Sequence, residues 1–230
     1  MILLTIGVLA LQGGFIEHIN LVRKAADRLK LHVSVIEVRT TQELARCDGL
    51  IIPGGESTTI SLVAAQSGLL EPLRDYVKVQ KKPVWGTCAG LILLSDQANA
   101  TKKGGQELIG GLGVRVHRNH FGRQTESFEA DLDLAFLGDD AAPFPGVFIR
   151  APVVEEVLAG PGSGVEVEVL ATLPGRLDRA AAGVSQANAK HGSGDIVAVR
   201  QGNVLGTSFH PELTGDARIH AWWLRSILGQ

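Results

Sequence analysis

The chain has 230 residues, 45% of them hydrophobic and 20% charged, and its formal net charge is -2 at pH 7. A chain of this length and composition can bury a substantial core, and it has no excess of positive charge for binding nucleic acid or an anionic membrane. No apolar run reaches the roughly 18 residues of a membrane-spanning helix. We therefore expect one globular domain over residues 1–230, with neither nucleic acid nor membrane as a partner.

The N-terminus and the cysteines bear on where the protein works. The first residues, MILLTIGVLALQGG, are apolar but lack the basic region of an export signal, and they lead into a glycine turn as a first core strand does. Two cysteines, Cys47 and Cys88, are too few for a disulfide framework or a cysteine-rich zinc site. We expect a reducing, cytoplasmic setting and no metal ion.

Strand-like and helix-like segments alternate through the first hundred residues. Leu3–Leu11 is almost continuously apolar, as a strand buried on both faces is, and after Gly13-Gly14 apolar residues recur at helical spacing from Phe15 to Leu29. Thr40 and Glu43 have the spacing of a capping box. The same reasoning predicts strands at 32–38, 49–53 and 83–87, and helices at 41–47, 62–70, 71–79 and from 89 onward. This alternation indicates an α/β fold, a parallel sheet with helices on both faces.

The chain changes character after about residue 105. Short β-like runs at 114–116, 147–149 and 165–170 precede a predicted hairpin, Asp195–Arg200 and Val204–Phe209, so the sheet continues and becomes partly antiparallel. An amphipathic helix is expected at 216–228. The segments 99–106 and 174–194 are expected to be surface loops and not a second domain.

Cys88 lies where the fourth predicted strand ends and its helix begins, the edge at which parallel α/β sheets bind ligands. Gly86-Thr87-Cys88-Ala89-Gly90 is the cysteine counterpart of the nucleophile elbow, a turn so tight that side chains two residues before and after the nucleophile would collide. The following helix directs its first N–H groups at the sulfur and favours the thiolate. A buried structural cysteine is the alternative. We interpret Cys88 as a nucleophile and Cys47, which has no such turn, as part of the core.

A thiol nucleophile needs a base and a group that orients the base. His210 follows the last β-like run, and in an extended segment Glu212 would point the same way and could hold the His210 ring. Pro211 is expected to keep this segment extended. A solvated turn is the alternative. The other histidines have no comparable setting, and we expect most of them at the surface.

The segment LIIPGGEST, residues 50–58, ends the third predicted strand. Its adjacent glycines would let backbone N–H groups approach a substrate oxygen, and with the N–H of Ala89 they would form an oxyanion hole for acyl transfer. An ordinary turn before a helix capped by Ser57 or Thr58 is the alternative, and one turn could serve both purposes. The segment lacks the pattern of a phosphate-binding P-loop.

Six segments across almost the whole chain resemble the glutaminase subunits of pyridoxal 5'-phosphate synthase, the PdxT/SNO family of class I (triad) glutamine amidotransferases. They are IGVLALQGGFIEH, GLIIPGGESTT, WGTCAGLILL, RNHFGRQTESFEADL, FIRAPVVE and SFHPEL. The cysteine and histidine motifs are those of the class, whereas RNHFGRQ, FIRAP and the N-terminal LQGGF with the histidine three residues later, His18, mark the subfamily. The resemblance implies a flavodoxin-like, three-layer α/β/α fold with a mixed, mainly parallel sheet, and no cofactor. Relative to compact family members, the two predicted loops look inserted.

The resemblance implies a role for each matching residue. Cys88 would attack the side-chain amide of L-glutamine, His210 would pass the proton to the leaving ammonia, and Glu212 would hold His210. Gly55 and Ala89 would supply the oxyanion N–H groups. The positions that match glutamine recognition are Gly55, Glu56, Ser57, Arg118, Ile149 and Arg150. An arginine with a carboxylate suits a zwitterion, although surface charges or ion pairs are the simpler reading of Arg118, Arg123 and Arg150.

The product also implies a partner. Ammonia released into neutral water is mostly protonated and useless as a nucleophile, so direct transfer to a second active site is an advantage. The resemblance implies a TIM-barrel synthase subunit that builds pyridoxal 5'-phosphate from a pentose phosphate, a triose phosphate and this ammonia. Gln12 matches a position at the partner contact, and we expect weak activity until the partner settles the Gly54-Gly55 loop. An amidotransferase subunit of another pathway, or a non-catalytic regulatory subunit, remains as an alternative.

Overall fold

The computed structural model describes residues 3–99, 106–118, 127–138, 141–158, 165–173 and 195–229. Within these ranges strands and helices alternate up to residue 94, and strands dominate the later part. The expected loop at 174–194 and most of the one at 99–106 lie outside the described residues, as do Asn119, His120, Arg123 and His191. None of the described helices combines the length and apolar character needed to cross a bilayer.

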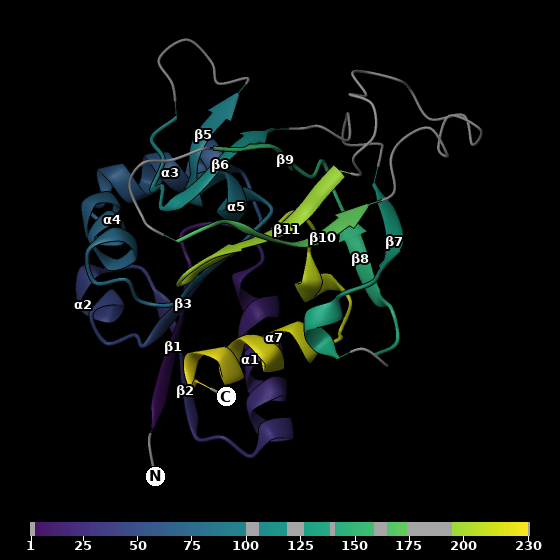
Figure 1. Ribbon diagram of the computed structural model, residues 1–230. Helices are drawn as coiled ribbons and strands as arrows, with labels where there is room; N and C mark the ends of the chain where they lie inside the picture. The colour runs from purple at the N-terminus through teal and green to yellow at the C-terminus, as the bar shows by residue number, and fades with distance from the viewer. Residues whose placement is uncertain are drawn as a thin grey trace.

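Five parallel strands form one half of the main sheet (Figure 1). In chain order they are β1 (Leu4–Leu9), β2 (Val33–Val38), β3 (Gly49–Ile52), β4 (Val84–Thr87) and β12 (Val204–Thr207). Their spatial order, β2-β1-β3-β4-β12, is the flavodoxin-like 2-1-3-4-5 arrangement when β12 is counted as the fifth strand. β3, β4 and β12 are buried at every residue, which is why their sequences lack the alternation of a one-sided strand.

The other half of the sheet is mainly antiparallel and contains most of the strands that the sequence did not predict. β11 (Asp195–Gln201) returns beside β12 through the predicted hairpin, and the order continues through β9 (Val153–Val157) and β6 (Leu112–His117) to β5 (Ser95–Asn99). β10 (Glu168–Leu173) also pairs with β11. β7 (Phe128–Leu132) and β8 (Phe144–Phe148) form a separate two-stranded sheet. β5, β7 and β9 were not expected.

Helices cover both faces of the parallel half, as predicted. On one face α1 (Phe15–Leu29) and α7 (Arg218–Ile227) lie side by side, away from the helices of the other face (Figure 1). That other face carries α2 (Thr41–Leu44), α3 (Ser57–Gln66), α4 (Leu70–Lys78) and α5 (Ala89–Leu94). The result is the expected three-layer α/β/α arrangement, with one apolar cluster on each side of the sheet.

The capping box at Thr40 is confirmed, and two helix boundaries are corrected. Thr40 Oγ1 accepts from the Glu43 N–H at 3.3 Å, and Glu43 Oε2 accepts from the Thr40 N–H at 2.9 Å. The helix ends at Leu44 and not near Cys47. The helix expected at 62–70 is in fact α3, which begins at Ser57, directly after the glycine turn. Cys47 is buried, as expected of a core residue, and its thiol donates to the Glu43 carbonyl at 3.3 Å.

Candidate active site

Cys88 occupies a turn that a non-glycine residue adopts only under strain. It is the N-cap of α5, with φ 47° and ψ -100°. A Cβ atom on Gly86 would lie 2.4 Å from the carbonyl carbon of Gly90, and one on Gly90 would lie 2.1 Å from the carbonyl oxygen of Ile52. The turn therefore needs both glycines. Gly90 is needed because β3 passes beside it. The collision within the turn that the sequence suggested is not the reason.

The pairing of β4 with β12 brings the histidine segment to Cys88. Thr87 and Thr207 are register partners in these parallel strands, and the Cys88 N–H donates to the Thr207 carbonyl at 2.8 Å. His210 follows three residues later, and its N–H donates to the Val147 carbonyl of β8 at 2.8 Å. Backbone hydrogen bonds thus fix the chain on both sides of the His210 ring.

His210 lies between Cys88 and Glu212. Its Nδ1–H donates to Glu212 Oε1 at 2.7 Å, and its side chain also hydrogen-bonds Cys88. Burial opposes a charge on the ring, but these two hydrogen bonds outweigh it and raise the pKa of His210 to about 10. Burial also opposes ionisation of Glu212, yet the neighbouring rings of His18 and His210 hold the pKa of Glu212 well below its usual range. At neutral pH the His210–Glu212 pair is therefore ionic.

The segment that carries this pair is not extended, contrary to expectation. Pro211 begins a short 3-10 helix, Pro211–Leu213, because a ring-fixed φ and a missing N–H suit the first position of a helix. Glu212 lies in the second position of this turn, and its carboxylate still reaches the His210 ring. The predicted contact is present, but the local structure that produces it is different.

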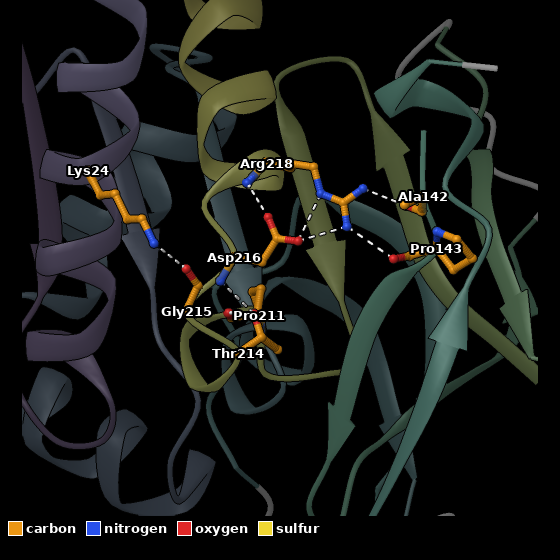
Figure 2. Close-up of polar contacts among 8 residues, drawn as sticks. All are labelled: Lys24, Ala142, Pro143, Pro211, Thr214, Gly215, Asp216 and Arg218. Carbon is orange, nitrogen blue, oxygen red and sulfur yellow. Dashed lines mark hydrogen bonds and ion pairs between the residues drawn. The ribbon is translucent and has the colours of Figure 1, made fainter. Parts of the chain in front are cut away.

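Hydrogen bonds and an ion pair among Pro211, Thr214, Asp216 and Arg218, here called the polar brace, fix the chain just beyond this turn (Figure 2). Thr214 Oγ1 donates to the Pro211 carbonyl at 2.9 Å and accepts from the Asp216 N–H at 3.1 Å. Asp216 in turn accepts from the Arg218 N–H at 2.9 Å and pairs with the Arg218 guanidinium at 2.7 Å. Further bonds join the brace to its surroundings, from Arg218 to the carbonyls of Ala142 and Pro143 and from Lys24 of α1 to the carbonyl of Gly215.

The glycine loop after β3 packs directly against the same histidine. A Cβ atom on Gly54 would lie 2.4 Å from His210 Cε1 and 3.4 Å from Cys88 Cβ. The Gly54 carbonyl accepts from the Gly14 N–H at 3.0 Å, so in this trans peptide the Gly55 N–H points away from Gly14. The three segments that the sequence analysis singled out therefore meet at the carboxyl edge of the parallel strands.

Gln12 holds the glycine loop from the end of β1. Its Oε1 accepts from the Glu56 N–H at 2.7 Å, and a Cβ atom on Gly55 would lie only 2.4 Å from that oxygen. Gln12, which the resemblance placed at a partner contact, thus has a structural role within the chain as well.

The residues assigned to glutamine recognition fall into two groups. Arg118 donates to Ser57 Oγ at 3.2 Å and lies 3.7 Å from Glu56 Oε1, so these three residues gather at the start of α3. Ser57 does not cap the helix, because Glu56 is the N-cap and Ser57 Oγ donates instead to Gln106 Oε1 at 3.1 Å. The second group, Ile149 and Arg150, directly follows β8, the strand whose Val147 carbonyl accepts from the His210 N–H. Arg150 is exposed and has a φ of 46°. Ala89 is the buried first residue of α5.

Two histidines expected at the surface are instead fully buried beside Glu212. His18 of α1 and His220 of α7 have no exposed area, and both pack on the Trp85 ring. The sequence contains a signal for this burial that we missed, because His18 stands four residues before Val22 on the apolar stripe of its helix, and His220 stands four before Leu224. Gln106 is a further residue that the sequence analysis left in a loop.

Two other features of the described residues do not compete with this site. The lining of a surface hollow of about 400 Å³ does not include Cys88, His210 or Glu212; it consists of Arg74, Lys78, Asp96, Gln106, Glu107, Leu108, Ile109 and Gly110. Among the same ranges of the chain, no group of three or more histidine, cysteine, aspartate or glutamate side chains could hold a metal ion.

The fold is that of the class I glutamine amidotransferases. A solved structure titled "Crystal structure of glutamine amidotransferase" covers 98% of this chain and 99% of its own, with 40% sequence identity and a TM-score of 0.71. The family can be stated more closely. The chain belongs to the SNO glutamine amidotransferase family, whose model matches residues 8–229.

Curated relatives agree with this assignment. The chain is 52% identical over 222 residues to the pyridoxal 5'-phosphate synthase subunit PdxT of Streptomyces avermitilis, covering 96% of this chain and 93% of that protein. It is 46% identical over 230 residues to the probable pyridoxal 5'-phosphate synthase subunit PDX2 of Arabidopsis thaliana, covering 96% of this chain and 85% of that protein.

Proposed function

We propose that this chain is the glutaminase subunit of a pyridoxal 5'-phosphate synthase, and that it hydrolyses L-glutamine to L-glutamate and ammonia through Cys88, His210 and Glu212. The observation that carries the proposal is one half-buried imidazole that contacts both a thiol at a strained turn and an ionised carboxylate. The family and the names of the relatives support the substrate and the pathway.

The first half of the reaction transfers the glutamyl group to sulfur. The sulfur of Cys88 attacks the side-chain carbonyl carbon of glutamine as the thiolate, with the protonated His210 ring beside it. The tetrahedral intermediate collapses when His210 gives its proton to the amide nitrogen, the carbon–nitrogen bond breaks, and ammonia leaves. In the second half, His210 takes a proton from water as the water attacks the thioester, and the products are glutamate and the free thiolate.

The glycine loop and the elbow supply the groups that stabilise the oxyanion. The Gly54 carbonyl is turned toward Gly14, so it does not present a negative oxygen to the oxyanion, and the N–H groups of Gly55 and Ala89 are the proposed donors. Arg118, Glu56 and Ser57 form one group for the zwitterionic end of the substrate, and Ile149 with Arg150 forms the other.

The proposed partner is the synthase subunit, which receives the ammonia. Gln12 connects the end of β1 to the backbone of the oxyanion loop, so a partner that contacts Gln12 can influence Gly55 through a single hydrogen bond. We therefore propose that docking of the synthase raises the glutaminase rate and that Gln12 transmits part of this effect. Equal rates with and without the synthase would refute the activation.

The decisive experiment measures glutamate release from L-glutamine by the purified chain, alone and with the synthase subunit, for the wild type and for Cys88→Ala. We expect release by the wild type and none above background by Cys88→Ala, while a Cys47→Ala control retains activity because Cys47 is buried in the core beside Gly7 of β1. Synthesis of pyridoxal 5'-phosphate from glutamine by the Cys88→Ala complex would instead identify a non-catalytic subunit. Activation by a synthase of another pathway would identify a different amidotransferase.

A further inference from the structure

Glu212 has two carboxylate oxygens, and the triad accounts for only one of them. Oε1 accepts from His210 Nδ1–H at 2.7 Å. Oε2 is buried and has no well-aligned hydrogen-bond donor among the described residues, but His18 Nε2 lies 3.2 Å away, at ion-pair distance. Removing an ionised oxygen from water without a donor is costly, so the group facing Oε2 bears directly on the charge of Glu212.

His18 is placed to supply that donor. A carboxylate oxygen only accepts hydrogen bonds, so His18 Nε2 must carry a proton to serve Glu212. The same nitrogen lies 3.1 Å from Thr87 Oγ1, the residue before Cys88, so its N–H is shared between the elbow and the carboxylate. His18 therefore contacts Glu212 of the triad and Thr87, the residue before Cys88, and is itself fully buried.

The contact with His220 determines which placement of the protons on the two imidazole rings has the lowest free energy. His18 Nδ1 and His220 Nε2 are 3.0 Å apart, so one of the two rings holds the proton between them. If His18 held it, His18 would be a cation and a neutral His220 would have its own proton on Nδ1, a buried atom with no partner in the described part of the chain. If His220 Nε2 holds the proton, that Nδ1 is a bare acceptor, which is less costly to bury than an unpaired N–H. Desolvation and the neighbouring His18 lower the pKa of His220, in agreement with a neutral ring.

We propose that His18, supported by His220, is a positioning residue of the triad: its Nε2–H holds the second oxygen of Glu212, which keeps that carboxylate ionised and directed at His210. The proposal rests on the proposed glutaminase function. His18 reaches the reaction only through Glu212 and the elbow, and it does not touch the substrate. Its loss is expected to change kcat and the pH dependence and to leave KM nearly unchanged.

The groups that could titrate around this network are few. Glu212 on the 3-10 turn faces His210 from its own segment, His18 from α1 and Cys88 across the His210 ring, and His220 of α7 lies behind His18. The carboxylate of Glu17 is near the outer edge, since a Cβ atom on Gly14 would lie 3.2 Å from Glu212 Oε1 and 3.6 Å from Glu17 Oε2. Without His18, the buried Glu212 would take up a proton at higher pH and would then release His210.

The test compares substitutions at His18 that retain or remove the donor. Gln places its amide nitrogen near the position of Nε2, Asn places it near Nδ1 and away from Glu212, and Leu removes it. The wild type, His18→Gln, His18→Asn and His18→Leu chains are assayed with L-glutamine and the synthase from pH 5 to 10, as full-length proteins. Val22→Ala, a buried truncation one turn further along the same apolar stripe, controls for lost packing.

Two readouts separate this proposal from the proposed function. The first is the acid limb of kcat. The second is the pH dependence of the alkylation of Cys88 by iodoacetamide, which needs neither glutamine nor the synthase. Cys47 does not interfere, because burial raises the pKa of Cys47 to about 11, and Cys88→Ala gives the background. If the wild type shows no Cys88-dependent glutamine hydrolysis, the proposed function fails, and the alkylation profile still decides the role of His18.

For His18→Leu and His18→Asn we expect kcat to fall about tenfold or more, with KM within about twofold of the wild type. We also expect the acid limbs of both pH profiles, that of kcat and that of Cys88 alkylation, to move up by about one pH unit. His18→Gln is expected to retain the wild-type limbs, and Val22→Ala is expected to lower only the melting temperature. Acid limbs that coincide for all four His18 proteins would overturn the proposal, whatever the stability of the variants. If His18→Leu does not fold, the Gln and Asn pair gives the same decision.

Discussion

Replacing Glu212 by Gln removes one charge from a side chain that is 1% exposed and leaves its shape almost unchanged. The lost interaction is the bond of 2.7 Å to His210 Nδ1. Charge-assisted hydrogen bonds contribute about 1.5–3 kcal/mol, which corresponds to about 10- to 150-fold in rate if the transition state loses the bond completely. The new amide can also donate to Nδ1 and so hold the wrong tautomer, and the corresponding change in a serine triad costs about 10⁴-fold.

We therefore expect kcat for glutamine hydrolysis to fall by about 10²- to 10⁴-fold, with KM little changed because Glu212 lies behind His210. The assay is glutamate release in the presence of the synthase, with Glu156→Gln, an exposed glutamate paired with Arg115, as the matched control. The melting temperature is expected to stay near that of the wild type, since the variant also loses the cost of burying a charge. A Glu212→Gln enzyme with kcat within about fivefold of the wild type would refute the assignment of Glu212, because such a loss is below that of one charge-assisted bond.

Three further predictions address the elbow, the histidine and the brace. Gly90→Ala would place a methyl group 2.1 Å from the Ile52 carbonyl oxygen, so the unfolding free energy should fall by about 1–3 kcal/mol or more. Gly113→Ala, whose methyl group would face the flexible Gln201 side chain at 3.3 Å, should cost much less. Equal denaturation midpoints for the two variants would contradict this prediction. The folded-state pKa of His210 is raised from 6.5 to about 10, so its contribution to stability is fully present below pH 6.5 and is lost as the pH rises toward 10. Urea unfolding at pH 6 and pH 10 should therefore show a larger loss of unfolding free energy for the wild type than for His210→Gln. Asp216→Ala should lower the melting temperature by a few degrees and kcat severalfold without changing KM, and Arg218→Ala should cost less in the Asp216→Ala background than alone because both remove the same ion pair.

The sequence predicted the parallel half of the fold well because each element there depends on local signals. The helix from Phe15 to Leu29 has the expected bounds, and the capping box at Thr40 is formed. Strands β1, β3 and β4 are apolar runs that need no partner to be recognised. β5 was missed for the opposite reason: Ser95–Asn99 is a polar edge strand that is extended because β6 lies beside it.

The candidate site was predictable where the chemistry leaves a motif and unpredictable where it depends on packing. The glycines around Cys88 and the spacing of His210 and Glu212 could be read directly, although Pro211 starts a 3-10 turn instead of extending the chain. His18 ends the motif segment IGVLALQGGFIEH, but that motif does not indicate what the His18 ring contacts. Its proposed positioning role depends on contacts among α1, α7 and the turn after β12, and no local sequence pattern predicts these contacts.

The position of β12 next to β4 has a consequence for how the family can vary. In the stretch of chain between α5 and β12, the described strands build the other half of the same sheet, and β12 then pairs directly with β4. Inter-strand hydrogen bonds therefore set the separation of the sulfur and the imidazole, whatever the length of that stretch. Insertions or deletions in that stretch can alter what approaches the thiol without moving the acid–base machinery. Arg118 and Arg150, which are proposed to recognise the substrate, belong to this stretch, so substrate selectivity can change while the reactive centre stays the same.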